Sequence, residues 1–429
     1  MGRGVRLILL SQPAGIVNPG GGGGGGGEPP TPFDPATLTN RSQAFATRFT
    51  LGEETTTEAG TSATPMIALT DVRNVRVAYG NRVGAGPAGT ITLKLALFTA
   101  GQTYPITWAG SPTVEIPEGI STHSDAVDVV IRKGQKVWML SYQQAGQLGP
   151  ARFTTAKAGY LTGDQTGDGT AFYLGASAKC GQVSWAYGDT VPGTLSLVGL
   201  GDSIAEQDYL TTACVAAGVP FANIAQWAQG TPGGNGMVDS PKWAGDHRLP
   251  ARVAVTEYGA NTAALSLGYP NPLATFAGVQ LNHWQGLADE GLIVAGCTMF
   301  PRSHSTDGWA TLGGQSEYTA GGIYPAGYAA LLTGYNAWIR DGAPIVGGVP
   351  APGPVDPSAI RKGDPGHPLQ APTFDLAATC QDPTNPWRWR IDHPAGLLTG
   401  DGTHLSAAGI TAMSAAAADW LGVLASALN

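Results

Sequence analysis

Hydrophobic and polar residues alternate with a period of two along the first part of the chain, from about residue 33 to residue 190. The alternation is clearest at 75–79, 91–97 and 127–131, and glycine, proline and asparagine turns separate these runs. A period of two is typical of β-strands that bury one face. Short strands at regular spacing predict an all-β sandwich, of the jelly-roll kind.

The pattern changes after about Val191, where apolar runs alternate with segments of helical periodicity. Strands are expected at 195–200, 252–256 and 292–299, and helices at 204–217, 276–290, 328–340 and 407–428. Ser406 stands directly before the last helix and is expected to cap its N-terminus. Alternating strands and helices predict an α/β domain of three layers with a mainly parallel sheet. In such sheets, functional sites lie at the carboxyl ends of the strands.

These two patterns and a glycine run divide the chain into three parts. Residues 1–35 include eight consecutive glycines and are predicted to be a flexible leader. Alternatively, residues 1–17 are a docking peptide that attaches the protein to a larger particle, such as a phage tail. Met1–Ser11 is too short and interrupted for a usual signal peptide. Residues 36–190 are then a β-sandwich accessory domain, and residues 191–429 are the α/β domain.

Composition restricts the partners. The 429-residue chain is 42% hydrophobic and 13% charged, with a net charge of -8. No Lys/Arg cluster would follow a phosphate backbone, so nucleic acid is not expected as a partner. No apolar run approaches the roughly 20 residues of a transmembrane span, so no transmembrane segment is expected.

The four cysteines indicate neither a metal site nor a redox motif, because no CxxC pair occurs. Cys214 and Cys297 lie in apolar stretches and are expected to be small core residues. Cys180 and Cys380 could form a disulfide. We expect no metal and no cofactor.

The first candidate for chemistry is Gly201-Asp202-Ser203, at the end of an apolar run. A serine at this place stands where a strand turns into a helix, and backbone N–H groups at a helix N-terminus can stabilise an anion. The alternative is that Asp202 or Ser203 only caps the helix.

The second candidate is Asp401-Gly402-Thr403-His404, just before the last helix. A serine hydroxyl is a poor nucleophile and needs an adjacent base, a role that suits histidine, whose ordinary pKa is about 6.5. A carboxylate three residues earlier can reach the other ring nitrogen and orient it. The alternative is a surface loop with an incidental Asp and His.

The third candidate is Gly259-Ala260-Asn261, which follows the apolar run 252–256. An asparagine amide at the end of a strand could donate a hydrogen bond to an oxyanion. The alternative is an ordinary Asn/Gly turn.

In this order, the three segments resemble the SGNH (GDSL-like) hydrolase family, which carries Gly-Asp-Ser in its first block, Gly-x-Asn-Asp in its third and Asp-x-x-His in its last. The stretch 223–231 lies where that family has its second block. The resemblance covers residues 191–429 and implies an SGNH-type serine esterase with a catalytic triad. It implies that Ser203 is the nucleophile, His404 its base and Asp401 the residue that orients the base. It also implies an oxyanion hole built from the Ser203 backbone N–H, the Asn261 side chain and a backbone N–H of the second block.

The sequence departs from the family pattern in two places. Thr262 follows Asn261 where the family usually has aspartate. In the second block, the family has a characteristic glycine whose backbone N–H serves as an oxyanion donor. Ala228 takes its place by spacing from Asn223, whereas Gly230 takes it by residue type. Both stay candidates.

Further similarity is found at 298–302, 306–309 and 336–340, which resemble the later stretch of many SGNH esterases and imply a loop beside the site and a supporting helix. His304 falls here and is a candidate pocket residue. The front segment resembles the β-sandwich region ahead of some secreted bacterial SGNH esterases. Trp108, Trp138 and Tyr142 could offer carbohydrate-stacking faces there, or could be buried in the sandwich.

Together these features predict hydrolysis of a carboxylic ester through an acyl-enzyme. The expected substrate is a small acyl group, such as acetyl, on a surface polysaccharide, and the expected location is extracellular or on a virion. One alternative is a lipase or general esterase. Another is an inactive structural or glycan-binding virion protein, although the intact Ser203, Asn261, Asp401 and His404 argue against it.

Overall fold

The structure is a computed structural model. It describes residues 34–48, 59–80, 90–117, 121–144, 159–167, 169, 185–225, 230–231, 251–317, 326–353 and 356–429. Residues 1–33 of the predicted leader lie outside this set, so the leader and its docking role stay predictions.

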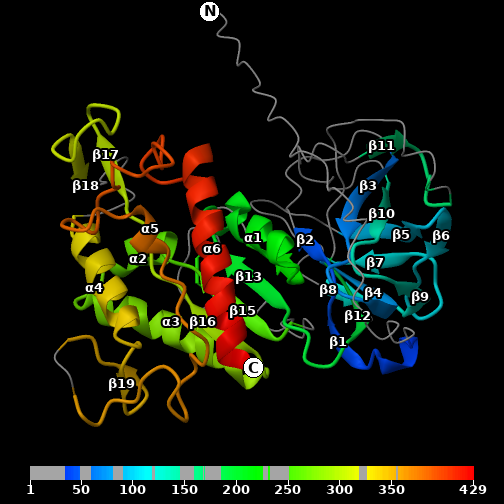
Figure 1. The fold of residues 1–429 in the computed structure, drawn as a ribbon, viewed down its shortest axis with the longest axis horizontal. Coiled ribbons are helices and arrows are strands. Elements are labelled where there is room, and N and C mark those ends of the chain that lie inside the picture. The colour runs from blue at the N-terminus through cyan, green and yellow to red at the C-terminus, as the bar shows by residue number, and fades with distance from the viewer. Residues whose placement is uncertain are drawn as a thin grey trace, which may run out of the picture. The chain divides into compact units, whose positions relative to one another are not determined.

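The front part of the chain consists of short strands (Figure 1). After a 3-10 turn, Pro35–Thr37, their bounds are β1 Asn40–Gln43, β3 Gly60–Ile67, β4 Val72–Gly80, β5 Ile91–Thr99, β6 Gln102–Pro105, β7 Val114–Ile116, β8 Ser121–His123, β9 Val127–Ile131, β10 Lys136–Gln143, β11 Gly159–Thr162 and β12 Trp185–Thr190. They form two antiparallel sheets, ordered β1-β12-β4-β8 with β9 on β4, and β11-β3-β10-β5-β6 with β7 on β5.

The alternating residues of the two sheets share one hydrophobic core. Val75 and Val77 of β4 are buried in the same cluster as Leu93 and Leu95 of β5. The period of two arises because each strand turns every second side chain inward. The jelly-roll topology stays a prediction.

For Trp108, this packing decides between the two alternatives of a stacking face and a buried side chain in favour of burial. Trp108 is only 7% exposed and belongs to the shared core, so its ring face is covered by neighbouring side chains. Trp138 and Tyr142 are half-buried.

The second part of the chain is built on a parallel sheet. Its strands are β2 Ala46–Arg48, β13 Leu197–Gly201, β14 Phe221–Asn223, β15 Val253–Glu257 and β16 Ile293–Gly296. They lie in the order β16-β15-β13-β14-β2, and each neighbouring pair is parallel. The other elements are η3 Ala205–Gln207, α1 Tyr209–Ala217, α2 Ala260–Ser266, α3 Pro272–Asp289, β17 Ser303–Ser305, β18 Gln315–Glu317, α4 Tyr328–Arg340, β19 Ile345–Val346, β20 Val349–Pro350, α5 Leu376–Cys380 and α6 Ala407–Leu428.

Helices cover both faces of this sheet. One face, represented by Val198 and Ala254, packs in a cluster with α2, α3 and α4. The other face, represented by Leu197 and Val253, packs in a cluster with α1, α5 and α6. Consecutive strand residues point to opposite faces, so a strand buried on both sides reads as a continuous apolar run. The expected α/β arrangement of three layers is therefore present.

Strand β2 comes from the front part of the chain, yet it extends the parallel sheet. It pairs with β14 in the register Ala46 to Phe221. The hydroxyls of Ser42 and Ser196, 2.7 Å apart, also join the two parts. Residues 35–429 form one compact unit by their contacts. The boundary at residues 190/191 stays a prediction.

Two local expectations after residue 200 are wrong. The helix expected at 204–217 is interrupted at Asp208, whose φ of 65° is left-handed, so Ser203 stands in a turn before the 3-10 helix η3 rather than at the start of a regular helix. The ordinary turn suggested as the alternative at Gly259-Ala260-Asn261 is also corrected, because Ala260–Ser266 forms the helix α2. Burial of Ala263 and Ala264 against the core stabilises this short helix.

The three cysteines among the described residues, Cys214, Cys297 and Cys380, are free and buried. Cys214 and Cys297 are thus core residues, as expected. Cys380 faces the Met413 sulfur at 3.6 Å instead of a disulfide partner, which corrects the suggested bond to Cys180. Cys180 itself lies outside the described residues.

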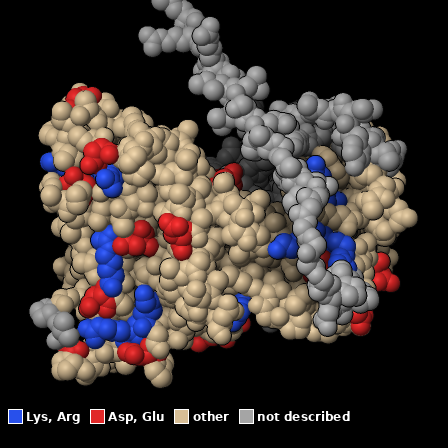
Figure 2. Space-filling view, viewed as in Figure 1, with Lys and Arg blue, Asp and Glu red and all other residues tan. Residues whose placement is uncertain are grey.

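Helix α6 is long and apolar enough to cross a membrane, judged by length and composition alone. One side of it, including Met413, Trp420 and Leu424, is buried in the core cluster that also contains α1. On the face seen in Figure 2, charged side chains of both signs lie near one another on a largely uncharged surface.

Candidate active site

Ser203 stands two residues beyond β13, in a turn that passes close to β15. A Cβ on Gly201 would come within 2.6 Å of the Ala205 Cβ and 2.9 Å of the Glu257 carbonyl oxygen, so glycine is required for this approach. The Ile204 backbone N–H donates to Asp202 Oδ1 at 2.9 Å. The N-caps of η3 and α1 are Ile204 and Asp208, so neither Asp202 nor Ser203 caps a helix, which corrects that alternative. The Asp202 hydrogen bond instead holds the turn on which Ser203 is presented.

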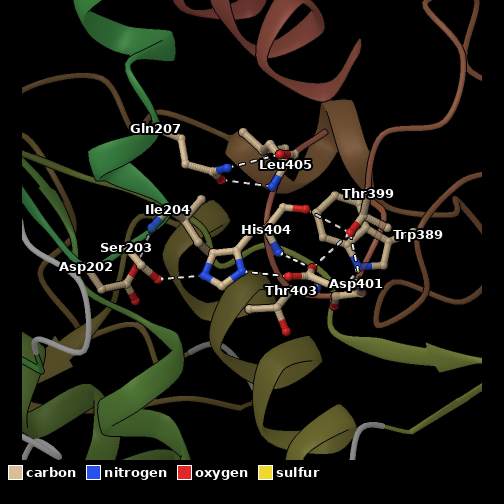
Figure 3. A network of polar contacts seen from close by, with 11 residues as sticks. Asp202, Ser203, Ile204, Gln207, Trp389, Thr399, Asp401, Thr403, His404 and Leu405 are labelled. Atoms are coloured by element: carbon tan, nitrogen blue, oxygen red, sulfur yellow. Dashed lines mark hydrogen bonds and ion pairs between the residues drawn. The ribbon is translucent and has the colours of Figure 1, made fainter. Parts of the chain in front are cut away.

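The structure brings together three of the predicted residues, in a chain of hydrogen bonds (Figure 3). Ser203 Oγ lies 3.0 Å from His404 Nε2. On the other side of the ring, His404 Nδ1 lies 2.8 Å from Asp401 Oδ2. Ser203 and His404 are 201 positions apart in the chain, so the fold, not the local sequence, creates this contact.

The Asp401 carboxylate has a second task within its own loop. Its Oδ1 accepts the backbone N–H of Thr403 at 2.8 Å and that of His404 at 2.7 Å. Burial acts to raise the pKa of Asp401, but hydrogen bonds from the His404 ring and from these N–H groups outweigh it, so the pKa is lowered. An ionised Asp401 favours the tautomer with the proton on Nδ1, which leaves Nε2 free to accept the Ser203 proton.

The loop that carries Asp401 and His404 is fixed at several points. Thr399 Oγ1 donates to the His404 carbonyl at 2.8 Å and accepts the Gly402 N–H at 2.9 Å. The Trp389 indole donates to the Gly402 carbonyl at 3.0 Å. Gly402 has a φ of +80°, and a Cβ there would overlap the Ser303 carbonyl oxygen. Glycine thus satisfies both the left-handed backbone and the close contact.

Asn261 lies in the first turn of α2, just beyond the end of β15, and is 7% exposed. Gly201 of β13 is in register with Glu257 of β15, and the two strands are parallel. Parallel neighbours end at the same edge of the sheet, so Asn261 and Ser203 share this edge.

The second block is described in part. Ala228 lies outside the described residues, while Gly230 is described and buried. Its neighbour Thr231 donates its backbone N–H to Thr262 Oγ1 at 2.7 Å. Gln280 Nε2 donates both to Thr231 Oγ1 at 2.8 Å and to the Tyr258 carbonyl at 2.7 Å. Thr262, which stands where the SGNH pattern usually has aspartate, therefore ties Thr231 to α2.

A pocket opens beside the nucleophile at the carboxyl ends of β15 and β16. It is small, with a volume of about 10 Å³, close to the space that one water molecule needs. Its lining residues are Ile204, Glu257, Tyr258, Gly259, Ala260, Cys297, Thr298, Met299 and Phe300. His304, half-buried on β17, is not one of them, so its predicted place in a pocket does not hold for this one.

Two carboxyl groups are buried under the turn that presents Ser203. Burial raises the pKa of Asp202, and burial together with the nearby Asp202 raises the pKa of Glu257 well above its usual value. Asp202 Oδ2 and Glu257 Oε2 have no hydrogen-bond partner among the described residues. The sequence pattern did not single out Glu257 or Gln280, because each acts through a neighbour that is distant in sequence. It also missed Thr399, whose partners Gly402 and His404 are near but are bound through their backbone groups.

The arrangement supports one kind of chemistry. A hydroxyl faces the free nitrogen of a histidine whose other nitrogen is held by an ionised carboxylate, so the proton of Ser203 Oγ can pass to Nε2 when the oxygen attacks an electrophile. Within the described part of the chain, no group of three or more His, Cys, Asp or Glu side chains could hold a metal ion.

No protein-family model and no curated protein matches the chain. Among solved structures, it is similar to a family two carbohydrate esterase from Clostridium thermocellum, an active-site mutant, at 12% identity and a TM-score of 0.33, covering 90% of this chain and 100% of that one. It is similar to a family two carbohydrate esterase from Cellvibrio japonicus at 10% identity and a TM-score of 0.33, covering 92% and 97%. A GDSL-like lipase from Bacteroides thetaiotaomicron is similar at 12% identity and a TM-score of 0.30, covering 51% and 84%. These similarities are weak in sequence and in superposition.

Proposed function

We propose that the protein is a serine ester hydrolase of the SGNH type. The observation that carries the proposal is the hydrogen-bonded chain from Ser203 Oγ through the His404 ring to Asp401, with distances of 3.0 and 2.8 Å. If the Asp and His of this loop were incidental, the His404 ring would not be expected to lie within hydrogen-bond distance of a serine 201 positions away in the chain.

The proposed reaction has two halves. Ser203 Oγ attacks the ester carbonyl carbon while its proton passes to His404 Nε2, and the collapsing intermediate releases the alcohol, which takes that proton. Water then attacks the acyl-enzyme and gives a proton to His404, and Ser203 recovers it as the carboxylic acid leaves. Asp401 stabilises the imidazolium in both halves.

The oxyanion of each tetrahedral intermediate needs donors at the same edge of the sheet. The Ser203 N–H, the Asn261 side chain and a second-block N–H are proposed for this task. The ties of Thr231 to Thr262 and Gln280 support Gly230 as the second-block donor, since they hold its neighbour beside α2. Ala228 stays an alternative.

The proposed substrate is a small acyl ester, with acetyl on a surface polysaccharide as the leading candidate. This choice rests on the sequence, because the β-sandwich and the leader that it predicts favour a surface glycan. The proposed extracellular or virion-associated location rests on the sequence pattern alone.

The test compares the protein with its Ser203→Ala, His404→Ala and Ser414→Ala variants. Ser414 is the matched control, because its hydroxyl only donates to the Ile410 carbonyl within α6. We expect the protein and Ser414→Ala to hydrolyse p-nitrophenyl acetate, release acetate from acetylated polysaccharide and react with a fluorophosphonate, and the other two variants to lose all three. Equal rates for the protein and Ser203→Ala would reject the esterase. Faster turnover of long-chain esters than of acetyl esters would favour a lipase instead.

A further inference from the structure

Gln207 joins the segment that carries Ser203 to the loop that carries His404. Its side-chain Nε2 donates to the Leu405 carbonyl at 3.0 Å, and its Oε1 accepts the Leu405 backbone N–H at 2.8 Å (Figure 3). One amide thus pairs with both polar groups of the residue next to His404, as a neighbouring strand would.

Gln207 is itself firmly connected to the nucleophile. Its backbone N–H donates to the Ile204 carbonyl at 3.0 Å in the 3-10 helix that follows Ser203. The carbonyl of Ala205, in the same turn, accepts from Asn223 Nδ2 at 3.0 Å. A displacement of Gln207 would therefore be transmitted to Ser203 over only four residues.

The other hydrogen bonds of the His404 loop described above do not reach the segment that carries Ser203, since Trp389 contacts the loop from elsewhere in the chain. Asp401 and Thr399 belong to the same loop as His404, so their hydrogen bonds fix the shape of that loop but not its place relative to β13. The Gln207 pair spans the gap between the two segments, 198 positions apart in sequence.

We propose that Gln207 is a positioning residue that sets the contact between Ser203 Oγ and His404 Nε2. The proposal rests on the proposed esterase function, and Gln207 itself touches no reacting atom. Losing both hydrogen bonds frees the His404 loop to shift. A displacement of about 1 Å at reacting groups can lower turnover by as much as about 100-fold.

The experiment replaces Gln207 by methionine, which has a similar length and no hydrogen-bonding amide. The matched control is Gln135→Met in the front part of the chain. The Gln135 amide also makes one donor and one acceptor bond, to Thr99 Oγ1 at 2.8 Å and from the Arg132 N–H at 3.2 Å. We expect Gln207→Met to lower kcat by about 10- to 100-fold with KM within twofold, and to slow fluorophosphonate labelling equally. Gln135→Met should keep both rates.

Gln207→Glu is the second variant. It keeps the acceptor for the Leu405 N–H but loses the donor to the Leu405 carbonyl, so we expect a smaller decrease in kcat than with methionine. The positioning role is rejected if Gln207→Met keeps the wild-type kcat. It is also rejected if both methionine variants have equally lowered melting temperatures and equally lowered kcat values, because the decrease would then reflect lost stability.

A spectroscopic measurement separates this proposal from the esterase proposal. In protein with ¹⁵N-labelled histidine, the Nε2 signal of His404 is identified by its loss in His404→Ala, and its displacement in Ser203→Ala reports the serine contact. We expect Gln207→Met to move this signal towards its Ser203→Ala position. An unmoved signal overturns the role of Gln207, whatever the protein hydrolyses. If the wild-type protein hydrolyses no ester but Gln207→Met still moves the signal towards its Ser203→Ala position, only the esterase proposal is overturned.

Discussion

The two carboxyl groups beneath the nucleophile are the least expected residues of the site. Asp202 is fully buried and Glu257 is 7% exposed, and each has one oxygen without a partner among the described residues. The remaining bond of Glu257 comes from the Ala205 backbone N–H, next to the Ser203 turn. An ionised pair in this place would be costly, so Glu257 is expected to hold a proton.

This protonation makes stability depend on pH. Burial, and then Asp202, raises the pKa of Glu257 in the folded protein. Its contribution to the free energy of unfolding is therefore fully present below the unfolded pKa of about 4.3 and is lost as pH rises through the folded pKa. As pH rises through this range, we expect the free energy of unfolding of Glu257→Gln to fall less steeply than that of the wild type. The two slopes should differ by up to about 1.4 kcal/mol per pH unit. Chemical denaturation at several pH values measures the difference, with the exposed Glu115→Gln as control. Parallel curves for Glu257→Gln and the wild type would show that Glu257 is ionised in the fold.

The sequence predicted the residues with reactive groups but not those that hold them. Ser203, Asp401 and His404 lie in short motifs, so their types and order could be read directly. Thr262 and Gln207 act through backbone groups of Thr231 and Leu405, which any residue type supplies. No pattern of side chains along the chain could reveal such pairs.

At the scale of elements, long periodic segments were predicted well. The helices expected at 328–340 and 407–428 have those bounds, and Ser406 Oγ accepts the Gly409 N–H at 3.1 Å as an N-cap. Short elements near the site were predicted less well. Tertiary packing decides α2 and the interruption at Asp208, and neither leaves a periodic signal.

The loop that carries Asp401 and His404 depends on Gly402. Replacing it by alanine adds the cost of a positive φ and an overlap with the Ser303 carbonyl. Gly396→Ala is the matched control, because Gly396 also has a positive φ, of 99°, while its added Cβ would be 4.0 Å from the nearest atom. We expect Gly402→Ala to lower turnover by at least about 100-fold and Gly396→Ala to keep it within a few-fold, with a small loss of stability in both. Similar turnover in the two variants would mean that the loop tolerates the overlap.

At the scale of the whole molecule, the two sequence patterns correctly indicated two kinds of architecture, antiparallel sheets followed by a parallel sheet with helices. They did not indicate that β2 crosses from the first to the second. A strand of three residues is too short to show periodicity, and its partner β14 is distant in the sequence.

This strand predicts that the α/β part depends on the segment before it. A chain beginning at Val191 would lack β2 and leave the edge of β14 without its backbone partner. It would also lose the Ser42 hydroxyl that meets Ser196. Compared with a chain beginning at Pro35, we expect it to be less stable by at least about 2 kcal/mol, since each lost hydrogen bond contributes about 1 kcal/mol. Urea denaturation of the two chains measures this difference. Equal midpoints would show that residues 191–429 fold independently.

The separation of Ser203 and His404 along the chain has a consequence for the protein during its synthesis. The ribosome makes the nucleophile first and the base about two hundred residues later, and α6 must then close over the sheet. A nascent chain that already has most of its strands therefore carries an inert serine. If the protein is the proposed esterase, it can hydrolyse no ester before its last described loop and helix have been translated and packed.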